Sequence, residues 1–462
     1  MSFSKRFFTC LLAAILFIGS LSFAVSAEDE IILPEITAKN AIAMHIDSGT
    51  VLFEKNADER TSIAFLAKVM TVLIALEEVE NLEELATVSM RSYGNDRLLP
   101  GEEMRVLDLL YCIMLATSND ACTVVAEHIS GSSEEFLVLM NERAKELGAT
   151  DTLFTTVHGI PDDNEDYTLD IYQHTTARDA LKIVSHAITL ERFYDISAGA
   201  TSDQPTISFE KISDAAYHQI PKTNKQAKRP LYTGNRFLIS SDEFYNTAVS
   251  GIKTSRTDFG ASICSVKEGR ITGLGKERIL CITMLSQLDR NRNHPAVCKD
   301  TNAIWDYCFE NYVYAELIGE GRITKTVNVE LGESADKVNL VSSSSVSGFI
   351  LGEYNRDKLE FRGEAPEFIN APVSKGEVVC AYEIIYDGKS YGTVSCVAAS
   401  SITRDELAFT LSQITDFFDS VYVKIFSILI ILAIIFYVGY AVFYNKKRKR
   451  ARARKVRNRF KF

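Results

Sequence analysis

One stretch near the C-terminus limits what this chain can fold into, because the twenty residues from Ile425 to Tyr444 carry no charge. As a helix that rises about 1.5 Å per residue, such a run would be about 30 Å long, which matches the hydrocarbon core of a bilayer. Eleven lysine and arginine side chains follow between Asn445 and Phe462. By the positive-inside rule, the pattern predicts a single transmembrane helix over 425–444 and a cytoplasmic tail over 445–462.

The basic tail raises the question of its partner. Cationic runs bind nucleic acid in some proteins, but a tail beside a membrane span lies against anionic lipid head groups. Without this tail and the two cations at Lys5 and Arg6, the chain has 37 basic and 61 acidic side chains, a balance of about −24. Such a domain is a poor ligand for polyanions. We therefore predict that anionic membrane lipids bind the tail and that nucleic acid is no partner.

The N-terminus has the pattern of an export signal. Lys5 and Arg6 precede an apolar run over 7–23, and small residues follow at Val25, Ser26 and Ala27. This pattern predicts a signal peptide over 1–27, removed before Glu28. An uncleaved anchor is the alternative, although the apolar run is short for a membrane span. The prediction places the large domain outside the cytoplasm, attached to the cell membrane.

Residues 28–317 mix strand-like runs with amphipathic helices, which predicts an α/β domain of the α+β type. The order is a strand pair, a helical middle and further strands. The expected strands are 41–46, 51–54, 251–253, 260–266 and 278–285, and the expected helices are 64–77, 106–116, 120–129, 133–147, 176–189 and 303–312.

After residue 317, β-branched residues alternate with polar ones over 324–331, 337–341 and 377–385. We predict a small all-β, sandwich-like domain over 318–400. Cys380 and Cys396 flank an expected turn at Asp387-Gly388 and could face each other across a hairpin, as a disulfide or as two thiols. The nine cysteines show no C-x-x-C spacing and no histidines at metal-site intervals, so no metal site is expected.

A helix is predicted between the β domain and the membrane span, over 401–424. Thr403 to Glu406 has the form of a capping box. Apolar residues then recur at helical spacing, which would let this helix lie against a membrane or a partner helix. A plain connector is the alternative. The apolar residues are Leu407, Leu411, Ile414, Phe418 and Val421.

Several motifs together resemble one family, the low-molecular-weight penicillin-binding proteins, which are serine D-Ala-D-Ala carboxypeptidases of the β-lactamase/transpeptidase-like superfamily. The resemblance covers about residues 37–400 and extends to the C-terminal membrane attachment. It implies a fold with a small β domain behind the catalytic one, a peptidoglycan substrate, and neither a metal nor an organic cofactor. The motifs are Asp47 to Arg60, Lys68-Val69-Met70-Thr71, Ser118-Asn119-Asp120-Ala121, Lys145-Glu146-Leu147-Gly148, His158-Gly159, Thr176-Ala177-Arg178-Asp179 and Gly251-Ile252-Lys253-Thr254.

The first motif differs from the family pattern at its most important position. The chemistry needs a serine and a lysine three residues apart on a helix, so that the amine can take the hydroxyl proton. Here the lysine is Lys68, but the serine position is Phe65. A phenyl ring cannot attack a carbonyl, and losing a nucleophile costs about 10⁶ in kcat, near 8 kcal/mol. Ser62 is a poor substitute, since it lies six residues from Lys68, about 240° around a helix.

The two other family motifs change less. The Ser-x-Asn motif, which implies a proton relay and a substrate-binding amide, is Thr117-Ser118-Asn119 and keeps a hydroxyl. The Lys-Thr-Gly motif, which implies a cation and a hydroxyl for the substrate carboxylate, is Lys253-Thr254-Ser255. The serine adds a side chain where the backbone should approach the ligand closely.

Each retained residue also has a structural interpretation. Lys68 would be costly to bury alone, which favours a partner in the pocket. Asn119 could cap the helix that follows it. Lys253 could be a surface lysine, and His158-Gly159 could be a structural turn. Phe65 could fill the former cavity and so abolish ligand binding.

Two functional classes follow from these residues. The first is a non-catalytic family member that binds a peptidoglycan stem peptide, or a protein partner, at the outer face of the membrane. The second is an active D-Ala-D-Ala carboxypeptidase with an unforeseen nucleophile. Phe65 favours the first class. A membrane-surface scaffold is a more remote third possibility.

Overall fold

The computed structural model describes residues 31–63, 65–89, 98–160, 173–198, 217–220, 222–223, 225, 229–289 and 295–459. The predicted signal peptide lies outside these residues, as does Ala64. The chain forms two compact units, which are described separately. The first runs to Tyr314 and includes Phe349–Tyr354, and the second comprises Ala315–Gly348 and the residues from Asn355 onward.

The first unit is built on a five-stranded sheet with the order β2-β1-β9-β8-β7. All four strand pairs are antiparallel, and β7 lies at an edge. β8 and β9 are longer than the sequence patterns predict, because their ends form an extended hairpin. The strands are β1 (Asn40–His45), β2 (Val51–Lys55), β7 (Val249–Thr257), β8 (Gly260–Ile271) and β9 (Gly275–Ser286).

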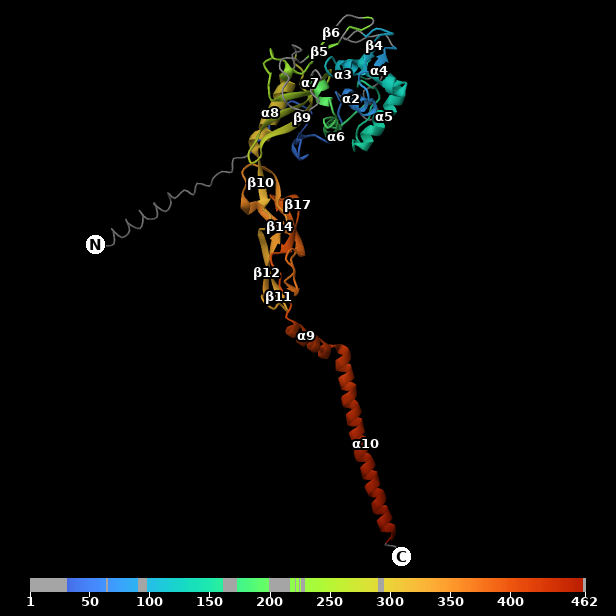
Figure 1. The fold of residues 1–462 in the computed structure, drawn as a ribbon, viewed down its shortest axis with the longest axis vertical. Coiled ribbons are helices and arrows are strands. Elements are labelled where there is room, and N and C mark those ends of the chain that lie inside the picture. The colour runs from blue at the N-terminus through green and yellow to red at the C-terminus, as the bar shows by residue number, and fades with distance from the viewer. Residues whose placement is uncertain are drawn as a thin grey trace, which may run out of the picture. The chain divides into compact units, whose positions relative to one another are not determined.

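Helices cover both faces of this sheet, as Figure 1 shows. Alternate strand residues point to opposite faces, so Ile42 packs into the larger core with the N-terminal helices, whereas Ala43 packs into the smaller core with α8. The five predicted N-terminal helices are present with ends within two residues of the expected positions. They are α2 (Leu66–Glu78), α3 (Val106–Met114), α4 (Asn119–Ser130), α5 (Ser133–Glu146) and α6 (Ala177–Ala187).

The remaining elements of this unit are short, except for α8. Helix α8 (Pro295–Asn311) begins eight residues before the predicted start. Its Trp305 is fully buried and donates a hydrogen bond to the Ile279 carbonyl over 3.1 Å. The short elements are β3 (Leu85–Thr87), β4 (Glu103–Arg105), α7 (Phe193–Ala198), β5 (Tyr217–Ile220), β6 (Arg229–Tyr232) and η1 (Arg236–Leu238).

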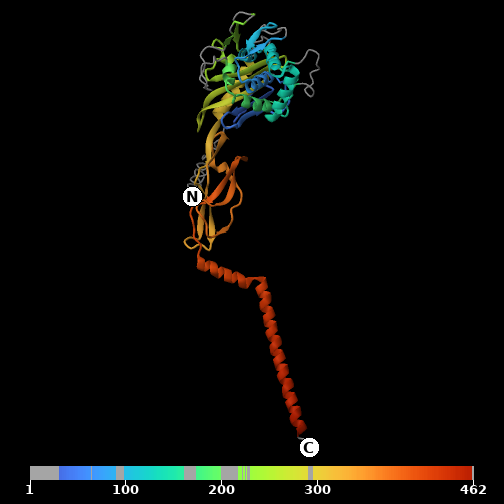
Figure 2. The same ribbon diagram turned by 45° about the vertical axis from the view of Figure 1, so that its right-hand side comes forward.

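The second unit contains an all-β region, which confirms that prediction (Figure 2). Its main sheet has the strand order β14-β16-β17-β12-β11-β15. Outside this sheet, β10 and β13, whose residues are divided between the two units, pair as a two-stranded sheet. The strands are β10 (Tyr312–Ile318), β11 (Ile323–Glu330), β12 (Lys337–Ser342), β13 (Val346–Leu351), β14 (Leu359–Arg362), β15 (Phe368–Asn370), β16 (Val378–Tyr386) and β17 (Lys389–Ala398), with η2 at Arg356–Lys358.

The predicted hairpin around Asp387-Gly388 is present between β16 and β17. Both turn residues have positive φ, +49° and +77°. Cys380 lies directly opposite Cys396 in the strand register, and both are free thiols in the structure. The hairpin therefore brings the two cysteines together without a disulfide.

Two helices follow the β region: α9 (Glu406–Asp419) and α10 (Val421–Arg459). The N-cap of α9 is Asp405, which accepts hydrogen bonds from the amides of Leu407 and Ala408. The predicted cap at Thr403 is therefore wrong, since the Thr403 hydroxyl instead donates to Glu333 over 2.9 Å. The stripe residues of α9 that the sequence predicted are exposed.

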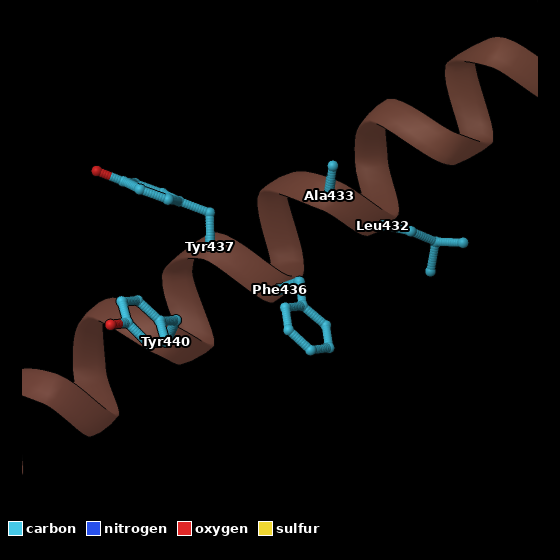
Figure 3. Close-up of a pocket in the computed structure, with 5 residues that line it drawn as sticks. All are labelled: Leu432, Ala433, Phe436, Tyr437 and Tyr440. Carbon is cyan, nitrogen blue, oxygen red and sulfur yellow. The ribbon is translucent and has the colours of Figure 1, made fainter.

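Helix α10 is long and apolar enough over Val421–Arg454 to cross a membrane. Figure 3 shows Leu432, Ala433, Phe436, Tyr437 and Tyr440 projecting outward around this helix. The rings of Tyr440 and Tyr444 stack with centroids 6.2 Å apart. A lipid bilayer would solvate the apolar side chains of this helix, which are otherwise exposed to water.

Candidate functional site

Phe65 stands immediately before α2, at the position where the sequence motifs predict the nucleophile. Its backbone is helical, with φ −80° and ψ −12°. The side chain is fully buried and belongs to the larger hydrophobic core. A buried apolar ring therefore occupies the predicted nucleophile position.

Lys68 lies three residues further, with 4% of its surface exposed. Its amine donates to Asn119 Oδ1 over 2.8 Å and to the His158 carbonyl over 2.6 Å. Burial lowers the pKa of Lys68. The lysine is thus held by polar partners from two other segments.

Asn119 is the first residue of α4, but it does not cap this helix. The N-cap is Ser118, whose hydroxyl accepts from the Ala121 amide over 2.9 Å. The interpretation of Asn119 as a cap is therefore wrong, and its side chain is available to hold Lys68.

His158 and Gly159 form a turn, since Gly159 has φ +82° and its amide donates to the Thr156 hydroxyl over 3.0 Å. His158 contributes its backbone carbonyl to Lys68. This arrangement matches the structural interpretation of the pair.

Lys253 approaches the same region from β7. Only 2% of its surface is exposed, so the interpretation as a surface lysine is wrong. Its amine donates to the Met114 carbonyl over 2.8 Å and to Thr117 Oγ1 over 2.9 Å. Burial, together with the positive charge of Lys68, holds the pKa of Lys253 well below its ordinary value.

Thr117 links this lysine to the α3–α4 connection. Its φ of +59° is unusual for a β-branched residue, and such backbone conformations gather at functional sites. Because the hydroxyl oxygen accepts from Lys253, its own hydrogen can be donated to a ligand. The three motif segments thus meet through the pairs Lys68–Asn119 and Lys253–Thr117.

A pocket of about 330 Å³ opens beside these residues. Phe65 does not line it, so the ring leaves this pocket open. Thr254 and Ser255, predicted as binding residues, both line the pocket with Thr117. The other lining residues are Gly234, Arg236, Arg256, Ala261, Ser262, Ile263, Val297 and Cys298.

The sequence patterns missed Gly234, Arg236 and Arg256. Arg256 directly follows the third motif on β7, so its position in the sequence could have identified it as a neighbour of the site. Arg236 and Gly234 carried no such sign, because they belong to a separate segment before β7 that folds back on the pocket.

One group of described residues away from the motifs has metal-ligand types. Ligand atoms of His45, Asp47 and Glu277 lie within 4.8 Å of one another. Each already has a protein partner: His45 Nε2 bonds Glu277 over 2.8 Å, and Asp47 bonds Arg278 over 2.8 Å. This group is best described as a structural polar cluster.

Comparisons with known proteins agree with the motifs. Residues 24–266 match the model of a family described as D-alanyl-D-alanine carboxypeptidase, and residues 312–404 match one described as penicillin-binding protein 5, C-terminal domain. The carboxypeptidase DacF of Bacillus subtilis is 26% identical over 83% of this chain and 91% of its own length. DacC of Escherichia coli is 28% identical over 79% and 84%.

Two solved structures share the fold. The carboxypeptidase DacD from Francisella tularensis is 20% identical, with a TM-score of 0.58 over 84% of this chain and 100% of that one. Penicillin binding protein 5 from Haemophilus influenzae is 22% identical, with a TM-score of 0.52 over 81% and 100%. Since the first family model covers more than half of the chain, this protein belongs to the D-alanyl-D-alanine carboxypeptidase family of low-molecular-weight penicillin-binding proteins.

Proposed function

We propose that this protein binds peptidoglycan stem peptides at the pocket beside Thr254 and does not form the acyl-enzyme of its family. Its place in the family assigns it to cell wall metabolism. The observation that carries the proposal is the fully buried Phe65 at the nucleophile position. The open pocket supports retained binding, because hydroxyls and cations still line it.

The retained residues can bind a peptide without cleaving it. Thr117 and Thr254 can donate hydrogen bonds to carbonyl or carboxylate oxygens. Lys253, which donates to Thr117 in the pocket wall, adds positive charge beside the pocket when it is protonated. Because these groups bind ground state and transition state alike, they give affinity without turnover.

A second candidate function rests on Thr117 and Lys253. The distance of 2.9 Å between Oγ1 and the amine, with a lowered lysine pKa, is the arrangement of a nucleophile and its base. Thr117 would attack the D-alanyl carbonyl while Lys253 takes the hydroxyl proton and passes it to the departing D-alanine amine. Water would then hydrolyse the ester. This would make the protein an active D-Ala-D-Ala carboxypeptidase.

The proposal includes a location. A signal peptide over 1–27 would export the domains at 28–317 and 318–400, the helix over 401–424 would lie at the membrane surface, and the span over 425–444 would anchor the chain in one pass. The basic tail over 445–462 would then contact anionic lipids in the cytoplasm. The apolar helix α10 supports the anchor. A protein partner at the outer membrane face is the alternative ligand.

Covalent labelling with a fluorescent penicillin tests the missing nucleophile. The purified full-length chain in detergent micelles should remain unlabelled, whereas Phe65→Ser should become labelled, because serine then lies three residues before Lys68. Phe65→Ala is the matched control, since it opens a similar cavity without a hydroxyl. Fluorescence of Trp305, the single tryptophan, reports whether each variant is folded.

The other outcomes are also informative. Labelling of the unaltered chain that disappears in Thr117→Val would establish the second candidate and refute the first. A stem peptide ending in D-Ala-D-Ala should bind the unaltered chain reversibly and remain intact by mass spectrometry. No measurable binding of this peptide would refute the proposal.

A further inference from the structure

The tyrosines of helix α10 gather on one face. At about 100° per residue, an arc of about 60° holds all of them, Tyr422, Tyr437, Tyr440 and Tyr444. We call this surface, together with Ala433 near its centre, the tyrosine face. Within the predicted span the opposite face is aliphatic and suits lipid chains, with Ile428, Ile431, Ile435, Val438 and Val442. The helix therefore has two chemically different sides within an apolar span.

Depth in the membrane divides these tyrosines into two groups. Tyr422 and Tyr444 lie near the two ends of the predicted span 425–444, where tyrosine is common because the membrane meets water there. Tyr437 and Tyr440 lie about 4 and 8 Å from the middle of the span, which has about 15 Å of hydrocarbon on each side. Their Cα–Cβ bonds tilt toward the helix N-terminus, away from the nearer, cytoplasmic interface. Both hydroxyls therefore lie in hydrocarbon, where an unpaired hydroxyl is unfavourable.

A shallow groove lies on the same side of the helix (Figure 3). It is lined by Leu432, Ala433, Phe436, Tyr437 and Tyr440. The last four have the i, i+3, i+4, i+7 spacing of the hole that receives a side chain from a facing helix. Ala433 forms a low floor, and such small residues let two membrane helices approach closely. No other described element covers this surface, since 73% of Tyr437 and 62% of Tyr440 is exposed.

The occupant of this groove has to cross the membrane and bring polar groups to the depth of Tyr437. A second copy of α10 meets both conditions, because the basic tails hold two copies parallel and bring their tyrosines to the same depth. A phenol hydroxyl both donates and accepts a hydrogen bond, so two tyrosine faces complement each other across a two-fold axis. A lipid chain would leave the hydroxyls unpaired.

We propose that two copies of this chain pair within the membrane through the tyrosine face of α10. Ala433 lies at the closest approach of the two helices, and the hydroxyls of Tyr437 and Tyr440 bond between the copies. The aliphatic face stays in contact with lipid. The inference goes beyond the proposed binding of stem peptides and rests only on the proposed membrane span.

The test measures energy transfer between two populations of the full-length chain in vesicles of phosphatidylcholine and phosphatidylglycerol. One population carries a donor and the other an acceptor, each a monomeric fluorescent protein fused after Phe462. Transfer in the unaltered chain should exceed that expected from random proximity and should fall as lipid dilutes the protein, which gives the Kd of the pair. The double variant Tyr437→Phe, Tyr440→Phe keeps both rings and loses both hydroxyls, so its Kd should rise about tenfold.

Two further variants separate the groove from general effects of bulk. Ala433→Ile fills the groove and should also raise the Kd about tenfold, because it keeps the two backbones apart. Val442→Phe adds bulk to the aliphatic face and is the matched control, so its Kd should remain unchanged. Trp305 fluorescence reports that the first unit of each variant is folded.

The outcomes separate this inference from the membrane location beneath it. Transfer at the random level in the unaltered chain would overturn the pairing, and a different membrane protein or lipid alone would then cover the tyrosine face. Transfer that is equally strong in the tyrosine variant and in Ala433→Ile would place the contact elsewhere and also refute the inference. Flotation of the vesicles tests the span itself, since a chain that does not float with them lacks the proposed anchor.

Discussion

Replacing the buried Lys253 with methionine should remove a pH dependence from the stability of the first unit. In the unfolded chain this amine keeps its proton up to a pH of about 10.4. In the folded chain burial and the charge of Lys68 hold its pKa well below that value. Between these two pKa values the unfolded state binds one more proton, so the free energy of unfolding rises as the pH rises.

Proton linkage sets the upper limit of this effect. One extra proton in the unfolded state gives a slope of up to about 1.4 kcal/mol per pH unit. Between the two pKa values, each further pH unit should therefore stabilise the unaltered chain by up to about 1.4 kcal/mol relative to Lys253→Met. The variant also loses the hydrogen bonds to Met114 and Thr117. Since that loss is nearly the same at every pH in this range, it shifts the curve without changing its slope.

Urea unfolding of the full-length chain in detergent micelles, followed by Trp305 fluorescence at several pH values, measures the slope. Trp305 is fully buried in the same unit as Lys253, so it reports on the relevant domain. Lys276→Met is the matched control, because 76% of the Lys276 side chain is exposed. Parallel curves for the unaltered chain and Lys253→Met would refute the assigned burial of the amine.

Two further predictions concern other parts of the chain. Glutathione disulfide should oxidise Cys380 and Cys396 to an intramolecular disulfide with release of two glutathione thiols, detected by peptide mapping. Because burial raises the pKa of Cys380 to about 11, the rate should rise about tenfold per pH unit between 7 and 10, and a flat rate would contradict this. Gly260→Ala would place a Cβ atom 2.6 Å from Leu285 Cα, which should lower the unfolding free energy by about 1–3 kcal/mol in the Trp305 assay. An unchanged midpoint of urea unfolding would show that the backbone of β8 and β9 around Gly260 can shift to admit the methyl group.

The sequence predicted those parts of the site that follow from spacing along the chain. The position of Phe65 relative to Lys68 and the hydroxyl at Thr117 could be read directly. The N-cap residues could not be read from the sequence. Ser118, Asn119 and Asp120 are all good capping residues, and only the position of the first helical turn decides which of them caps the helix. The same ambiguity led to the wrong cap at Thr403, where Asp405 lies two residues further along.

Local sequence patterns could not predict contacts between segments that are distant in the chain. The bond between Lys253 and Thr117 joins residues 136 positions apart, so no local periodicity indicates it. The pocket likewise combines β7, β8, the start of α8 and the segment around Gly234. Arg256 becomes a pocket residue only when these segments enclose a space beside it.

The energetic cost of the two lysines bears on whether the site still has a ligand. Lys68 and Lys253 are both almost fully buried, and the charge of Lys68 opposes that of Lys253. Among the described residues, the hydrogen bonds of the two amines go to carbonyl, amide and hydroxyl oxygens and not to carboxylates. Apolar residues of similar size are often neutral or stabilising in place of buried charges. Under the proposed function, an anionic ligand would offset this cost when the amines are protonated, since it would supply negative charge.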